Sequence, residues 1–112
     1  MITNFKNLNP KINESCFIAS TADIIGDVTV KEKSSIWFNT VLRGDVNKIE
    51  VSSGTNIQDG CIVHVADEYP TIIGNNVTIG HGAIIHGCTI KDGAFIGMGA
   101  IILDGAVIGE GA

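Results

Sequence analysis

Apolar residues recur at every sixth position along most of this chain. The spacing fits neither the 3.6-residue period of an α-helix nor the two-residue alternation of a half-buried strand. The residue four positions after each of them is usually small or short. A hexapeptide period predicts a parallel β-helix, in which stacked coils bury one continuous core. The recurring positions, separated by breaks of nine, ten and five residues, are Ile12, Ile18, Ile24, Val30, Ile36 and Leu42; Val51, Ile57 and Val63; Ile73, Ile79 and Ile85; and Ile90, Ile96, Ile102 and Ile108.

The composition suits a narrow interior of this kind. The chain is 45% hydrophobic but only 5% aromatic, so Ile, Val and Ala must fill the core in place of large rings. The 14 glycines fit corners where the backbone takes angles that other residues avoid. A glycine-rich β-sandwich is the alternative fold, but a sandwich has no reason to keep a six-residue register.

The repeat resembles that of the hexapeptide-repeat proteins, whose fold is a left-handed parallel β-helix. The resemblance implies an all-β fold with three hexapeptides in each triangular coil, and thus about six coils here; the handedness follows from the resemblance alone. We expect one domain over 1–112, with an N-terminal cap over 1–11 and hexapeptide coils over 12–112. Relatives usually continue into further coils and a C-terminal helix. Because the sequence stops in mid-hexapeptide at 109–112, we expect that helix to be missing.

Charge, the N-terminal sequence and the cysteines indicate which partners and which location to expect. The net charge is −5 with no basic cluster, which argues against binding to nucleic acid or to an anionic membrane surface. Residues 1–15 mix Asn, Lys and Glu with isolated apolar positions and lack the pattern of a signal peptide. Two of the three cysteines, Cys16 and Cys61, fall at small inward positions, which predicts free buried thiols and a cytoplasmic location.

All three histidines lie in the stretch from Asn56 to Gly87. His64 and His86 each follow a core position by one residue. They are 22 residues apart, and the break of ten after Val63 contributes four extra residues, so they are one 18-residue coil apart. Neighbouring strands are about 4.8 Å apart, which would let two stacked imidazoles share one ion.

His81 occupies a different position in the repeat, two residues after Ile79. We expect it on an adjacent face, where it could complete the site of a neighbouring subunit if three prisms pack around a threefold axis. The result would be a three-histidine site between subunits with an open fourth position, as in catalytic zinc centres. Taken one at a time, each histidine could equally be an ordinary surface residue.

The polar motifs around these histidines resemble those of the γ-class carbonic anhydrases, in order and over nearly the whole chain. The matching segments are LRGD at 42–45, NIQDG at 56–60, His64, and GHGAIIHG at 80–87. The resemblance implies that His64, His81 and His86 are zinc ligands. It also implies that Gln58 and Asp59 line the pocket and orient the metal-bound water.

Three further positions in these motifs are open to more than one interpretation. The resemblance implies that Arg43 and Asp45 form a pair at the subunit interface, although a solvated surface pair beside a glycine turn is an equal alternative. For Asn56 we favour a role as a turn or ladder residue.

Two positions depart from the family pattern. Active members carry a glutamate just after the RGD-like turn, where this chain has Val46, and a longer acidic loop after the first histidine. Here that loop is only 65–70, and Asp67 or Glu68 is the candidate proton shuttle. A weak shuttle would let proton release limit turnover.

The leading hypothesis is therefore a homotrimeric, Zn²⁺-dependent enzyme that converts CO₂ to bicarbonate, with Fe²⁺ or Co²⁺ as alternative metals. One alternative is a hexapeptide acyltransferase or thioesterase that acts on an acyl-CoA. Acyl transfer needs one catalytic histidine and a long groove, whereas three histidines converge here. The other alternative is a non-enzymatic trimeric metal-binding scaffold.

Overall fold

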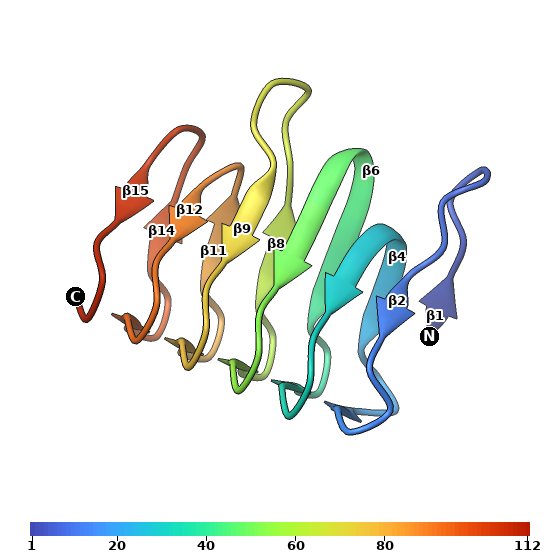
Figure 1. Ribbon diagram of the computed structural model, residues 1–112, viewed down its shortest axis with the longest axis horizontal. Coiled ribbons are helices and arrows are strands. Elements are labelled where there is room, and N and C mark those ends of the chain that lie inside the picture. The colour runs from blue at the N-terminus through green and yellow to red at the C-terminus, as the bar shows by residue number, and fades with distance from the viewer.

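The computed structural model describes residues 1–112 as a solenoid of parallel strands without a helix (Figure 1). Successive coils stack side by side, so the two termini lie at opposite ends of the stack. The parallel β-helix predicted from the hexapeptide period is confirmed. No helix capable of crossing a membrane is present.

The strands are short because each occupies one side of a coil. Two long strands, β4 and β6, bend around a corner and run along two sides (Figure 1). The bounds are β1 (Ile2–Thr3), β2 (Lys11–Ile12), β3 (Phe17–Ile18), β4 (Asp23–Val30), β5 (Ser35–Ile36), β6 (Val41–Val51), β7 (Asn56–Ile57), β8 (Ile62–His64), β9 (Thr71–Ile73), β10 (Thr78–Ile79), β11 (Ile84–His86), β12 (Thr89–Ile90), β13 (Phe95–Ile96), β14 (Ile101–Ile102) and β15 (Val107–Ile108).

The strands form three ladders, one on each side of the prism. One side is a separate five-stranded sheet in the order β13-β10-β7-β5-β3. The other two belong to a ten-stranded sheet that is continuous through β4 and β6. The five-stranded ladder corresponds to five coils on that side, close to the number expected from the repeat.

The hexapeptide positions are the interior of the prism. In the five-stranded sheet, Ile57 pairs with Ile79 and Ile79 with Ile96, so like residues stack coil upon coil. Ile57 and Ile79 are fully buried, and the exposed fraction of Ile96 is 6%. β-branched side chains in register fill such an interior without large rings. The two other sides repeat the arrangement, for example at Val63 and Ile85.

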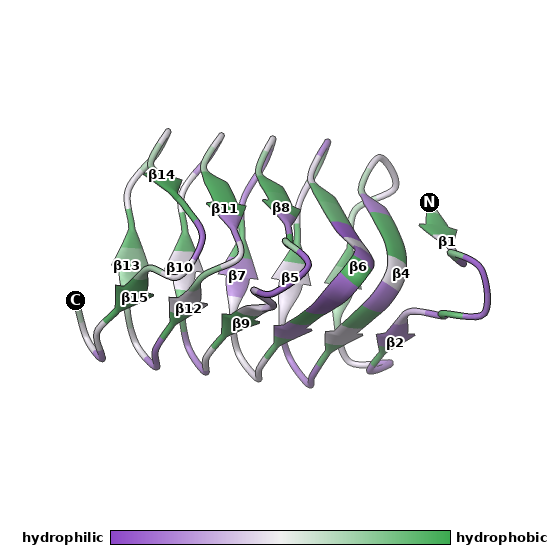
Figure 2. Ribbon diagram, turned by 90° about the horizontal axis from the view of Figure 1, so that it is seen from above, coloured by the Kyte–Doolittle hydropathy of each residue, from purple (hydrophilic) through white to green (hydrophobic).

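Both long breaks in the repeat lie at corners between two sides. At the nine-residue break, Gly44 of β6 pairs with Gly26 of β4 and Ile49 pairs with Val28. The β6 residues between Gly44 and Ile49 therefore lie opposite a single residue of β4, Asp27, and β6 bulges there. Three of the four residues in this segment, Asp45, Asn47 and Lys48, are polar, and the centre of β6 is accordingly purple in Figure 2. The ten-residue break is the β8–β9 loop, which projects beyond the neighbouring coils in Figure 1 and closes through paired Ala66 and Tyr69.

The segment predicted to be a cap, 1–11, takes part in the ladder. β1 pairs with the first half of β4 and β2 with its second half, both in parallel. The N-terminal residues therefore cover the first coil by adding strands to it, with a turn closed by Phe5 and Leu8.

The backbone at the corner of β4 requires a glycine, and a substitution can test this requirement. Gly26 has φ +78°, and a Cβ there would overlap the carbonyl oxygen of Gly44 on the next coil. We expect Gly26→Ala to lower the free energy of unfolding by more than about 2 kcal/mol, because it adds a backbone clash to the cost of a left-handed conformation. Denaturant unfolding measures this. Gly99→Ala is the control, since Gly99 has φ +71° but no atom within 4 Å of an added Cβ; equal losses in both variants would contradict the clash.

Candidate metal centre

His64 and His86 end two neighbouring strands on the same side of the prism. They are Cα partners in the parallel pairing of β8 with β11. Val63 and Ile85, one residue earlier, point into the core and are fully buried. Because side chains alternate along a strand, the two histidines must point outward. The stacking predicted from the 18-residue spacing is confirmed.

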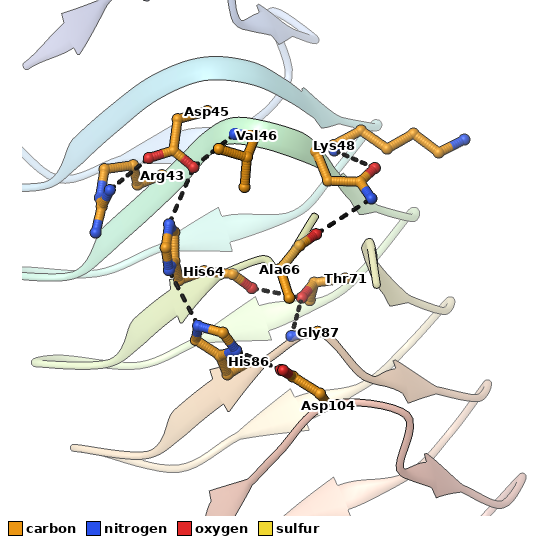
Figure 3. A network of polar contacts seen from close by, with 11 residues as sticks. Arg43, Asp45, Val46, Lys48, His64, Ala66, Thr71, His86, Gly87 and Asp104 are labelled. Carbon is orange, nitrogen blue, oxygen red and sulfur yellow. Dashed lines mark hydrogen bonds and ion pairs between the residues drawn. The ribbon is translucent and has the colours of Figure 1, made fainter. Parts of the chain in front are cut away.

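The two imidazole rings approach each other through one nitrogen each, at an interplanar angle of 71°, and are flanked by carboxylates (Figure 3). His64 Nδ1 lies 3.1 Å from His86 Nε2. On the outer side, His64 Nε2 lies 3.0 Å from Asp45 Oδ1, and His86 Nδ1 lies 2.5 Å from Asp104 Oδ1. The result is a line of four groups, Asp45–His64–His86–Asp104, that crosses successive coils.

The chemistry of this line fits a shared cation. A carboxylate accepts hydrogen bonds, so each outer ring nitrogen is the one that carries N–H in a neutral imidazole. The lone pairs of His64 Nδ1 and His86 Nε2 then lie on the inner side of the pair, 3.1 Å apart, where a shared cation would stabilise both. Two nitrogens bound tetrahedrally to Zn²⁺ at about 2.0–2.1 Å would be roughly 3.3–3.4 Å apart. The observed 3.1 Å is close to that separation.

A buried threonine fixes the backbone of both histidine strands. Thr71 begins β9, and its hydroxyl donates to the carbonyl oxygen of His64 at 2.6 Å. The N–H of Gly87 donates to the same hydroxyl at 2.8 Å (Figure 3). Thr71 is fully buried, so these bonds are shielded from water and hold the ends of β8 and β11 at a set distance.

Asp45 lies in the bulge of β6 and binds three partners. Its Oδ2 pairs with Arg43, and its Oδ1 accepts from the N–H of Val46 at 2.7 Å and from His64. Burial raises the pKa of Asp45, but the hydrogen bonds from Val46 and His64, together with the nearby Arg43, outweigh it, so the pKa lies below its usual range. The predicted Arg43–Asp45 pair is therefore present within one chain. Its position at a subunit interface remains a prediction.

His81 does not join the other two histidines. It lies at the corner between β10 and β11 and is exposed. Its Nδ1 is 3.2 Å from Asp59 Oδ1. Asn56, Gln58, Asp59 and His81 line a surface pocket of about 210 Å³, together with Trp37. The two predicted catalytic residues thus lie with His81.

The three histidines do not form one cluster within the chain. No group of three or more His, Cys, Asp or Glu side chains is arranged to hold a metal within it. This agrees with the expectation that His81 is poorly placed to close on its own chain's pair. The pair and the His81 pocket lie on different parts of the surface.

The candidate proton-shuttle residues lie at the tip of the β8–β9 loop. Asp67 and Glu68 are both exposed. The loop backbone is held by Asn47, whose side-chain amide donates to the carbonyl oxygens of Ala66 and Asp67 at 3.3 Å and 3.0 Å. Neither acidic side chain contacts a histidine, so a proton could reach them only through water.

Three features of the site could not be predicted from the sequence. Asp104 follows His86 by 18 residues, but Ile85 pairs with Ile102 at an offset of 17, so the repeat spacing does not align Asp104 with His86. The contact of Asp45 with His64 depends on the bulge in β6, which moves Asp45 off the regular spacing. Trp37 in the wall of the His81 pocket has no signal beyond its being the only tryptophan.

The chain is similar to proteins of one family. Residues 70–102 match the family model described as "Bacterial transferase hexapeptide (six repeats)". The chain is 52% identical over 105 residues to "Gamma carbonic anhydrase 2, mitochondrial" of Arabidopsis thaliana, covering 88% of this chain and 38% of that protein. It is 49% identical over 111 residues to "Carbonic anhydrase" of Geobacillus kaustophilus, covering 99% of this chain and 61% of that protein. The chain thus spans less than two thirds of these relatives.

Solved structures agree in fold. A structure described as "putative acetyltransferase, product of BC4754 gene" from Bacillus cereus is 53% identical with a TM-score of 0.96, covering 98% of this chain and 64% of that one. A "hexapeptide transferase family protein" from Anaplasma phagocytophilum is 45% identical with a TM-score of 0.86, covering 98% and 68%. The parallel β-helix, the hexapeptide register and these similarities agree, and the chain belongs to the γ-carbonic-anhydrase-like proteins of the hexapeptide-repeat family.

Proposed function

We propose that this chain is a subunit of a homotrimeric γ-class carbonic anhydrase that binds Zn²⁺ between subunits and hydrates CO₂ to bicarbonate. The observation that carries the proposal is the His64–His86 pair, in which two ring nitrogens face one another at 3.1 Å while carboxylates hold both outer nitrogens. Histidine ligands in metal centres commonly donate their second N–H in this way. The relatives named carbonic anhydrase support the same reaction.

The proposed trimer completes the site by placing His81 of one subunit opposite the His64–His86 pair of the next. In a closed ring of three, such a head-to-tail contact repeats three times and gives three equivalent sites. His81 is 55% exposed and so is free to meet a neighbour. Asp59, in contact with His81 Nδ1, would hold that ring as Asp45 and Asp104 hold the other two.

A Zn²⁺ ion in a three-histidine site supplies hydroxide at neutral pH, because it lowers the pKa of a water to about 7. The side chains of this chain bind and orient the reactants. Gln58 presents an amide that can both donate and accept beside His81, and Trp37 forms an apolar wall suited to CO₂. Addition of hydroxide to the carbon of CO₂ yields bicarbonate and leaves one proton to be released.

Release of that proton is the step that this chain serves least well. Val46 is exposed and cannot carry a proton. We propose that water transfers the proton to Asp67 or Glu68 in the β8–β9 loop, whose carboxylates are exposed to bulk solvent. Slow turnover relative to a member with a glutamate in place of Val46 is the expected consequence. Zn²⁺ is the proposed metal, and Fe²⁺ or Co²⁺ would suit the same imidazole ligands.

A reducing compartment such as the cytoplasm is the proposed location. The three cysteines are free, and Cys61 and Cys88 are buried. Burial raises the pKa of the Cys88 thiol to about 11, so this thiol is inert at neutral pH. The Arabidopsis relatives are named as mitochondrial proteins.

Acyl transfer is the second candidate, because the Bacillus cereus neighbour is described as a putative acetyltransferase. An acyltransferase or thioesterase acting on an acyl-CoA would use a single histidine, and His81 beside Asp59 is the exposed candidate. A trimeric scaffold that binds metal without turnover is the third.

The test is metal analysis of the purified protein beside stopped-flow CO₂ hydration, with acetyl-CoA consumption measured in parallel. We expect about one Zn²⁺ per subunit, hydratase activity that a chelator removes and Zn²⁺ restores, and no acetyl-CoA turnover. His81→Ala should lose both zinc and activity. Zinc binding without hydration would favour the scaffold, and turnover of acetyl-CoA that survives removal of metal would favour the acyltransferase.

A further inference from the structure

Each histidine of this chain has its own aspartate. Asp45 contacts His64, Asp59 contacts His81, and Asp104 contacts His86. Asp45 and Asp59 belong to the motif segments around the histidines, whereas Asp104 lies outside them, on the loop between β14 and β15. Its place in the site is evident only from the fold.

Asp104 reaches His86 because its coil lies directly against that of His86. The N–H of Gly105 donates to the carbonyl oxygen of Gly87 at 2.8 Å, which fixes the Asp104 turn against the end of β11. From there Asp104 Oδ1 approaches His86 Nδ1 at 2.5 Å (Figure 3). His86 Nε2 is thereby turned toward His64.

The residue at position 87 leaves room for this contact. Gly87 has φ +56°, and a Cβ there would come within 2.5 Å of Asp104 Oδ1 and 3.0 Å of the Cβ of Tyr69. A side chain at 87 would therefore push the carboxylate away from His86. The glycine, the docked turn and the carboxylate form one arrangement.

We propose that Asp104 is the positioning residue of His86. It accepts the Nδ1–H of the ring, which holds His86 in the tautomer and orientation that leave the Nε2 lone pair directed at His64. The inference rests on the proposed function only in taking Zn²⁺ as the ion that this lone pair binds. Asp104 itself contacts neither metal nor substrate in this role.

The test compares Asp104→Asn with Asp92→Asn. Asp92 is an exposed aspartate two hexapeptides before Asp104, and its Oδ1 likewise accepts from a neighbouring coil, from the N–H of Asn75 at 2.8 Å. Both substitutions remove one negative charge from an aspartate that accepts a hydrogen bond from a neighbouring coil, but Asp92 touches no histidine. Zinc affinity is measured by competition with a chromophoric chelator. We expect the Kd for Zn²⁺ to rise about 10–100-fold in Asp104→Asn and to stay near the wild-type value in Asp92→Asn.

A second readout uses the metal-free protein. Long-range ¹H–¹⁵N NMR at alkaline pH reports which ring nitrogen of His86 carries the proton. We expect the Nδ1–H tautomer to dominate in the wild type and in Asp92→Asn, and to lose its dominance in Asp104→Asn. Asp104→Asn that binds zinc as tightly as the wild type, or that weakens zinc binding without changing the tautomer, would overturn the inference. So would equal losses of affinity in both variants.

Failure of the proposed function gives a different result. A wild-type protein that binds no zinc contradicts the function, whereas the tautomer shift in Asp104→Asn would still support the Asp104–His86 contact. A wild-type protein that binds zinc while Asp104→Asn leaves both readouts unchanged contradicts the inference alone.

Discussion

Refolding a mixture of His64→Ala and His81→Ala subunits is expected to restore zinc sites that neither variant forms alone. His64→Ala breaks the ligand pair, and His81→Ala removes the residue that the pair of the next subunit needs. In a ring of three with head-to-tail contacts, every mixed trimer has one interface where an intact pair meets an intact His81. The pairing of His64 with His86, and the separate position of His81 beside Asp59, are the observations behind this expectation.

The size of the recovery can be stated in advance. When the two variants are mixed equally and assemble at random, about three quarters of the trimers are mixed and each holds one of its three sites, so zinc should return to about one quarter of the wild-type content. Hydratase activity should return in the same proportion. Each variant refolded alone is the control. Mixed trimers, verified by differential tagging and mass, that bind no zinc would contradict a site shared between subunits.

Ile79→Asp is expected to unfold the chain. Ile79 is fully buried in β10, where it stacks between Ile57 and Ile96 in the five-stranded ladder. An aspartate there would place an unpaired carboxylate in an apolar interior, at a cost of several kcal/mol. The total stability of a domain is about 5–15 kcal/mol, and a solenoid coil is supported mainly by its two neighbours. Circular dichroism and size-exclusion chromatography measure the loss.

Two control variants separate burial from other effects. Thr78→Asp introduces the same charge one residue earlier on the outward face of β10, where Thr78 is only half-buried, and should leave the fold intact. Ile79→Val keeps the apolar contact and should cost about 0.5–1.5 kcal/mol. A soluble, cooperatively folding Ile79→Asp protein would show that the hexapeptide positions do not form the core.

The fold was determined by local sequence pattern to an unusual degree. A six-residue period of Ile and Val can be buried continuously only if each hexapeptide forms one side of a coil, so the core positions could be read directly from the spacing. The same arithmetic placed His64 and His86 together, because both follow a core residue by one position and are one coil apart after the extra loop residues are removed. The structure has them as Cα partners. His81, two residues after Ile79, was correctly separated from them for the same reason.

The contacts around the histidines were decided by the tertiary structure. Asp45 reaches His64 only because β6 bulges at a corner, and a break of nine residues in a repeat does not say which residues leave the ladder or where they point. Ile85 pairs with Ile102, so Asp104 lies one position beyond the residue in register with His86, and only the docking of Gly105 on Gly87 brings its carboxylate within reach. A repeat sets which residues face the interior, because burial of apolar side chains is periodic. The direction and partner of an outward polar side chain depend on the turn beside it and on the neighbouring coil, which no periodic pattern encodes.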